Sequence, residues 1–220
     1  MSELKYKAII FDLDGTLIDS LEDIADSMNI VLKKNGYPPH SYDDYRYLVG
    51  SGARKLVASA IPEERRENDI VNECLKLFKE IYNKNWHVKT RPYPGITGML
   101  YRIAKLGIKT SVLSNKPDDF TKRCVKKFLP DILFEIVLGM RDNIPPKPDP
   151  AAALEIAAEL EISPEKFLYI GDTAIDMKTA NSAGMSAVGV LWGFRSREEL
   201  LENGAKALVG NPMEILEIIL

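Results

Sequence analysis

Two aspartates, Asp12 and Asp14, follow directly after an apolar segment in the stretch FDLDGTLIDS, residues 11–20. The apolar residues 8–11 before them are typical of a buried strand. An Asp-x-Asp-Gly sequence also forms turns, because Asp binds its own backbone and Gly tolerates positive φ. Taken alone, the pair leaves two interpretations open, a turn or a catalytic pair of carboxylates.

Further polar side chains follow other apolar segments, and these are Ser114, Asn115 and Lys116, then Lys147 in the loop IPPKPDP, then Asp172 and Asp176. Ligands of open α/β sheets bind outside the carboxyl ends of the strands, so we expect these groups to converge on one edge. Each has an alternative: Ser114 could cap a helix. The Pro-x-x-Pro stretch around Lys147 could be a rigid surface loop or a polyproline ligand, and the later acids could complement a helix dipole.

Clustered carboxylates repel one another unless a cation offsets their charge. Oxygen ligands without nearby His or Cys indicate a hard ion, and Mg²⁺ binds through one or two carboxylates, waters and a phosphate oxygen. The hydroxyl of Ser114 and the ammonium of Lys147 could hold the other phosphate oxygens. A carboxylate beside such a phosphate can attack phosphorus and form an aspartyl-phosphate.

The elements that position these groups are predicted from apolar runs alternating with amphipathic ones. Strands are expected at 6–11, 108–113, 134–138, 167–170, 187–191 and 207–209, and helices at 117–128, 150–160, 173–183 and 197–203. Thr173 is expected to cap one helix, and Ser196 with Glu199 to form a capping box. This alternation predicts an α/β, doubly wound, mostly parallel sheet. Residues 20–86 show no strand pattern, and 20–36 and 68–86 are amphipathic, which indicates a helical insertion.

The composition is that of an ordinary globular protein: 220 residues, 45% hydrophobic, 28% charged, formal net charge −3. No basic block suggests nucleic acid as a partner, and no apolar run approaches the roughly 20 residues of a membrane helix. We therefore expect a cytoplasmic protein with no nucleic acid and no membrane partner. Cys74 and Cys124 have no metal or redox spacing, so both are expected to be structural thiols.

The motifs FDLDGTLIDS, LSNK, KPDP and GDTAIDM, in this order and spacing, resemble those of the haloacid dehalogenase superfamily of phosphatases, over essentially the whole chain. The resemblance implies a Rossmannoid core with an inserted cap. It implies that Asp12 is the nucleophile. Asp14 would act first as the general acid and then as the base, and it would also offer its backbone carbonyl to Mg²⁺. Ser114, with Asn115 beside it, and Lys147 would hold phosphate, and Lys147 would also restrain Asp12. Asp172 would bind the metal directly, Asp12 would be a further metal ligand, and Asp176 would be a second acid near the metal.

The resemblance also divides the chain into a catalytic core, 1–18 and 88–220, and a small helical cap, 19–87. In the cap, Gly50 and Gly52 of the stretch LVGSGARKLV would let the backbone approach substrate, and Arg54 could face an anionic tail. The alternative is a glycine turn leading into a helix with a solvated Arg54. The second acid, Asp14, is present in the phosphatases and absent from the carbon–halogen hydrolases, so a phosphatase is expected.

The expected substrate is a small phosphorylated metabolite, most simply 2-phosphoglycolate. A sugar phosphomutase, a pyrophosphatase or a nucleotidase of the same fold are alternatives, and so is a non-catalytic binding protein. Phosphonate-cleaving relatives use a cap lysine as a Schiff base, and Lys33, Lys34 and Lys55 keep that chemistry open. Monomer and homodimer are both compatible with the sequence.

Overall fold

The computed structural model describes residues 4–220, and within them the chain forms two compact units. One unit comprises the described residues up to Ile18 together with Pro92–Leu220, and the other comprises Asp19–Arg91. The helical unit therefore continues to Arg91, beyond the expected end at His87. Two short strands, β2 (Ile18–Asp19) and β3 (Arg91–Pro92), pair with each other where the chain passes between the units.

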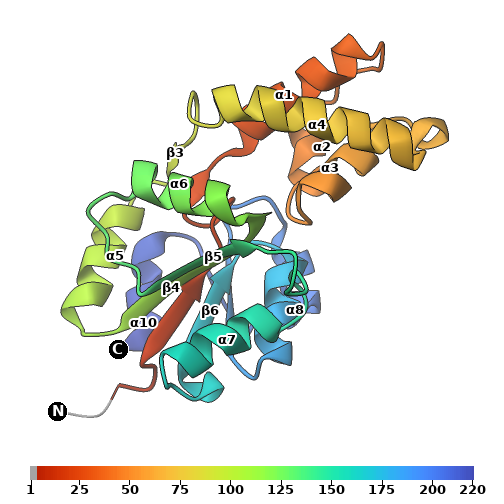
Figure 1. The fold of residues 1–220 in the computed structure, drawn as a ribbon. Helices are drawn as coiled ribbons and strands as arrows, with labels where there is room; N and C mark the ends of the chain where they lie inside the picture. Colours follow the sequence, from red (N-terminus) through yellow and green to blue (C-terminus); the bar gives the residue numbers. More distant parts are fainter. Residues whose placement is uncertain (1–3) are drawn as a thin grey trace. The chain divides into compact units, whose positions relative to one another are not determined.

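The first unit is built on a six-stranded sheet in the order β5-β4-β1-β6-β7-β8, in which every described pair of neighbours is parallel (Figure 1). Its strands are β1 (Ala8–Phe11), β4 (Lys109–Pro117), β5 (Ile136–Met140), β6 (Phe167–Gly171), β7 (Ser186–Val190) and β8 (Ala207–Val209). In the centre, Phe11 is in register with Val112 of β4 and with Ile170 of β6. The residues after these three strands therefore start from one edge of the sheet.

Helices cover both faces of this sheet. They are α5 (Ile96–Lys105), α6 (Asp118–Phe128), α7 (Ala151–Glu159), α8 (Ala174–Ser182), α9 (Arg197–Glu202) and α10 (Ile215–Ile219), with 3-10 turns η2 (Pro164–Lys166) and η3 (Pro212–Glu214). Ala8 and Ile10 of β1 share one apolar cluster with α7, α8 and α9. Ile9 and Phe11 point to the opposite face, because strand side chains alternate. Figure 1 shows α7 and α8 in front of the sheet and α10 behind it, which confirms the doubly wound α/β prediction.

The strand β4 is longer than predicted. It continues to Pro117, whereas its apolar pattern ends at Leu113, and its pairing with β5 shifts register between these two residues. The polar residues 114–116 lie in the irregular stretch between the pair Leu113–Leu138 and the pair Pro117–Met140, and hydropathy does not reveal that the strand resumes after them. The alternative that Ser114 caps a helix is therefore wrong, since α6 begins only at Asp118, after Pro117.

The second unit is helical, with α1 (Leu21–Lys34), α2 (Tyr42–Leu48), α3 (Ala53–Ala60), a 3-10 turn η1 (Glu63–Arg65) and α4 (Asn68–Asn85). The two long helices α1 and α4 pack on each other through their apolar faces, as their amphipathic patterns predict. A buried carboxylate, Asp23, anchors the end of the unit. It accepts hydrogen bonds from the backbone of Lys89 (3.0 Å) and from the backbone (2.9 Å) and hydroxyl (2.7 Å) of Thr90. None of the helices within residues 4–220 combines the length and apolarity needed to cross a bilayer.

Candidate active site

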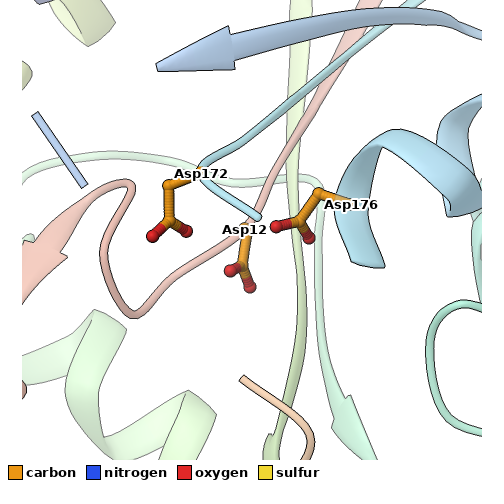
Figure 2. Close-up of side chains that lie close together, drawn as sticks. All are labelled: Asp12, Asp172 and Asp176. Atoms are coloured by element: carbon orange, nitrogen blue, oxygen red, sulfur yellow. The ribbon is translucent and has the colours of Figure 1, made fainter. Parts of the chain in front are cut away.

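Three buried carboxylates converge beyond the carboxyl ends of β1 and β6. Asp12 follows β1, Asp172 follows β6, and Asp176 lies in the first turn of α8. One oxygen of each lies within 4.8 Å of the others, and Figure 2 shows the three side chains gathered at one point. The close approach of α8 to β6 requires glycine at position 171, because a Cβ there would lie 2.3 Å from Cβ of Asp176.

The ammonium of Lys147 joins two of these carboxylates. Its Nζ donates to Asp12 Oδ1 (2.8 Å), to Asp176 Oδ1 (2.7 Å) and to the carbonyl of Leu113 (3.0 Å). The loop that carries Lys147 is held by Asn115, whose amide nitrogen donates to the Lys147 carbonyl (3.0 Å) and whose oxygen accepts from the Lys147 backbone N–H (2.9 Å). The structure therefore gives the Asn115 side chain a partner within the protein, and its contact with substrate stays a prediction.

Burial and mutual repulsion disfavour the charges of this cluster. Desolvation and the neighbouring Asp176 raise the pKa of Asp12 to about 7, even though Lys147 acts in the opposite direction. Desolvation, together with Asp12 and Asp176, also raises the pKa of Asp172 well above its ordinary value. Burial opposes the charge of Lys147 as well, yet the two carboxylates hold its pKa well above the ordinary value. Lys147 is therefore charged. Its single positive charge does not balance the three carboxylates of the cluster.

Asp172 is oriented by two contacts that the sequence pattern does not predict. The hydroxyl of Thr16 donates to Oδ1 (3.2 Å), and the backbone N–H of Phe194 donates to Oδ2 (2.8 Å). Both come from loops that pass close to the carboxylate. Gly15 has a φ of +87°, and a Cβ on it would lie 2.3 Å from Asp172 Oδ2. Only glycine fits there, which gives the glycine of the FDLDGT motif a physical reason.

Asp176 is oriented by the start of α8. Its Oδ2 accepts from the backbone N–H (3.1 Å) and the hydroxyl (2.7 Å) of Thr173, the residue expected at the cap.

The capping box expected at Ser196 and Glu199 is only half formed. Ser196 accepts from the Glu199 backbone (3.3 Å), but the Glu199 carboxylate accepts from the backbone of Ala174 instead (3.3 Å).

Asp14 lies outside the cluster of three carboxylates and has its own lysine. Lys116 Nζ donates to both oxygens of Asp14, at 2.9 and 3.0 Å. The hydroxyl of Ser114, which is also buried, accepts from the Lys116 backbone N–H (3.2 Å). The sequence predicts Lys116 at this edge of the sheet but does not predict its pairing with Asp14.

The expected cap residues belong to the helical unit. Gly50 and Gly52 have φ values of 120° and 87°, and Gly52 precedes α3. The exposed guanidinium of Arg54 donates to the side chains of Asn68 (3.1 Å) and Asn72 (2.5 Å) on α4. The structure therefore ties Arg54 to its own unit, and its contact with substrate stays a prediction.

The chain is similar in sequence and fold to known proteins. A family model described as haloacid dehalogenase-like hydrolase matches residues 9–190. A phosphoglycolate phosphatase of Pseudomonas putida is 33% identical over 193 residues, covering 86% of this chain and 70% of that protein. An N-acetylmuramic acid 6-phosphate phosphatase of Pseudomonas aeruginosa is 30% identical over 221 residues, covering 100% and 97%. A crystal structure from Lactobacillus delbrueckii subsp. bulgaricus, named provisionally as a phosphoglycolate phosphatase, has a TM-score of 0.92 and 32% identity, covering 98% and 99%.

Proposed function

The chain belongs to the haloacid dehalogenase-like hydrolases and is a phosphoric monoester hydrolase, and we propose that it hydrolyses 2-phosphoglycolate with Mg²⁺ through an aspartyl-phosphate. The observation that carries the proposal is the buried Asp12, which is bound by Lys147 and lies beside Asp172 and Asp176. A carboxylate held in this way keeps a fixed orientation, so that one of its oxygens can be directed at phosphorus for nucleophilic attack.

A divalent cation fits the donors that the chain offers. Asp12, Asp172 and Asp176 bring three carboxylates and Lys147 brings one ammonium, which leaves two excess negative charges in the cluster. Burial raises the pKa values of Asp12 and Asp172, and repulsion from the neighbouring carboxylates raises them further. Oxygen donors favour a hard ion such as Mg²⁺, with the Asp14 carbonyl as a further expected ligand. When bound, the ion would neutralise the carboxylates and polarise the phosphoryl group.

The side chains divide the reaction between them. Asp12 attacks phosphorus as the bond to the leaving oxygen breaks, while Asp14 donates a proton to that oxygen. Asp14 then takes a proton from the water that attacks the aspartyl-phosphate, which releases inorganic phosphate and restores Asp12. Ser114 and Lys147 hold the phosphoryl oxygens, and Lys147 also keeps Asp12 oriented. Gly50, Gly52 and Arg54 of the helical unit are proposed to contact the rest of the substrate.

The names of two relatives, the phosphoglycolate phosphatase and the N-acetylmuramic acid 6-phosphate phosphatase, suggest the chemical class of the substrate. 2-Phosphoglycolate and N-acetylmuramic acid 6-phosphate are phosphomonoesters that also carry a carboxylate, so we place the substrate in that class. The second compound is a specific alternative, because its phosphatase matches the whole of this chain. Sugar phosphomutase, pyrophosphatase and nucleotidase activities remain the other enzymatic alternatives. The cytoplasmic location inferred from the composition stays a prediction.

The test is phosphate release from both carboxylated phosphomonoesters, pyrophosphate, a nucleoside monophosphate and a hexose phosphate, each with Mg²⁺ and with EDTA. Asp12→Asn should fold and lose turnover, whereas Asp43→Asn, at an exposed acid, should keep it. Turnover that survives Asp12→Asn would overturn the nucleophile assignment. A requirement for catalytic amounts of a sugar bisphosphate would indicate the mutase. Mg²⁺ binding without release from any compound would favour the binding protein.

A further inference from the structure

We infer that Lys116 is a positioning residue that holds the carboxylate of Asp14 for proton transfer, an inference that rests on the proposed role of Asp14 as acid and base. The ion pair is two-pronged, with Lys116 Nζ at 2.9 and 3.0 Å from the two oxygens of Asp14. Only 5% of the lysine side chain and 13% of the aspartate side chain are exposed. Both side chains are therefore restrained in a nearly water-free environment, where the directions of the hydrogen bonds between them are well defined.

The backbone of Lys116 is itself fixed from three sides. Its N–H donates to Ser114 Oγ (3.2 Å), and its carbonyl accepts from the hydroxyl of Thr121 on α6 (3.1 Å). The neighbouring strand β5 has glycine at position 139, where a Cβ would lie 2.6 Å from that carbonyl oxygen. The end of β4, the start of α6 and β5 thus set the origin of the lysine side chain, so Nζ reaches Asp14 from a rigid base.

The two buried lysines at this edge serve different acids. Lys147 contacts Asp12 and Asp176, whereas Lys116 contacts Asp14. A buried ion pair adds little net stability, because desolvation offsets most of the attraction. Its larger effect here is geometric. When Asp14 carries the proton for the leaving group, that proton sits on one carboxyl oxygen while the other oxygen still accepts from Lys116, so the side chain keeps one orientation apart from the negative cluster around Asp12.

The consequence for the reaction depends on the leaving group. As the bond between phosphorus and oxygen breaks, an alkoxide leaving group needs the proton of Asp14, whereas p-nitrophenolate leaves readily without one. The ratio kcat/KM reports the steps up to formation of the aspartyl-phosphate, so it isolates the acid role of Asp14 from its later role as base. Loss of positioning should therefore lower kcat/KM selectively for alkyl phosphates.

The experiment measures kcat/KM of Lys116→Met with Mg²⁺ for an alkyl phosphate, 2-phosphoglycolate or the best substrate found, and for p-nitrophenyl phosphate. We expect a loss of about 10- to 100-fold for the alkyl phosphate and of less than about 3-fold for the aryl one, since general acid catalysis contributes about 10²- to 10⁴-fold. Lys122→Met, at an exposed lysine of α6, is the matched control and should change neither. If Lys116→Met does not fold, Lys116→Gln is measured for the same ratio of losses.

A double variant separates positioning from a general structural effect. In the Asp14→Asn background, Lys116→Met should add less than about 2-fold, because residues that act through one another are not additive. Equal losses for both substrates, or full additivity, would overturn the role of Lys116. If Asp14→Asn itself shows no leaving-group selectivity, the acid assignment in the proposed function is wrong. If Asp14→Asn is selective and Lys116→Met is not, only the inference about Lys116 is wrong.

Discussion

The metal-free protein should become less stable as the pH rises from 5 to 7.5. In the folded state the pKa of Asp12 is raised from 3.8 to about 7, mainly by burial and then by Asp176. Between these two values the folded state keeps a proton that the unfolded state has lost. Unfolding therefore releases a proton, and the free energy of unfolding falls with rising pH.

The magnitude follows from the size of the shift. One pKa unit corresponds to about 1.4 kcal/mol, so Asp12 alone should cost about 2 to 3 kcal/mol between pH 5 and 7. Asp172 acts in the same direction, because its pKa is also raised. Carboxyls whose pKa is lowered, such as Asp118 and Glu155, add stability that is already fully present above pH 5, so they do not mask the effect.

The assay is urea unfolding followed by circular dichroism at pH 5, 6, 7 and 7.5, in EDTA and in excess Mg²⁺. Mg²⁺ should raise the free energy of unfolding most at pH 7.5 and least at pH 5, where protons compete for Asp12. Asp12→Asn removes one of the two carboxyls with a raised pKa, so the stability of this variant in EDTA should depend less on pH. A free energy of unfolding in EDTA that stays constant or rises from pH 5 to 7.5 would refute the reasoning.

Two further substitutions, each with a control, test residues that stabilise the two units. Gly171→Ala should lower phosphatase activity at least about 10-fold and destabilise the protein by about 1 to 3 kcal/mol, because the new Cβ would meet Asp176, which Lys147 contacts. Gly98→Ala is the control: it meets nothing within 4 Å on helix α5 and should stabilise by about 0.5 to 1 kcal/mol. Asp23→Ala should cost about 2 to 4 kcal/mol in urea unfolding, since it removes the buried acceptor of the Lys89 and Thr90 backbones. Asp26→Ala, which removes an exposed ion pair with Lys89, should cost less than about 1 kcal/mol, and equal losses at Asp23 and Asp26 would contradict the anchoring role.

The sheet and the convergence of the acids could be predicted because both depend on local patterns. Buried parallel strands are continuous apolar runs, and their carboxyl ends meet at one edge, so Asp12 and Asp172 had to come close. The contacts that orient these acids depend on the exact paths of loops. Phe194 binds Asp172 through its backbone N–H, which its side chain does not reveal.

The partner of Asp14 was missed for a related reason. Lys116 lies 102 positions further along the chain, and its segment was expected to be a loop, because the apolar pattern of β4 stops at Leu113. The strand continues through these polar residues, and only this extended backbone carries Lys116 to Asp14. The signal that could reveal the pair is the parallel pairing of β1 with β4, which brings the ends of both strands, and so Asp14 and Lys116, to the same edge of the sheet.

The acids of the site differ in how much positive charge lies beside them. Burial, and then repulsion from the neighbouring carboxylates, raises the pKa values of Asp12 and Asp172, and the ammonium of Lys147 contacts only Asp12 and Asp176 of the three acids. Asp14 has the ammonium of Lys116 at hydrogen-bond distance from both of its oxygens. A divalent cation entering the cluster would therefore relieve the repulsion around Asp12 while the contact between Asp14 and Lys116 stays as it is. Metal binding would thus favour the ionised form of Asp12, the proposed nucleophile, without disturbing Asp14, the proposed acid.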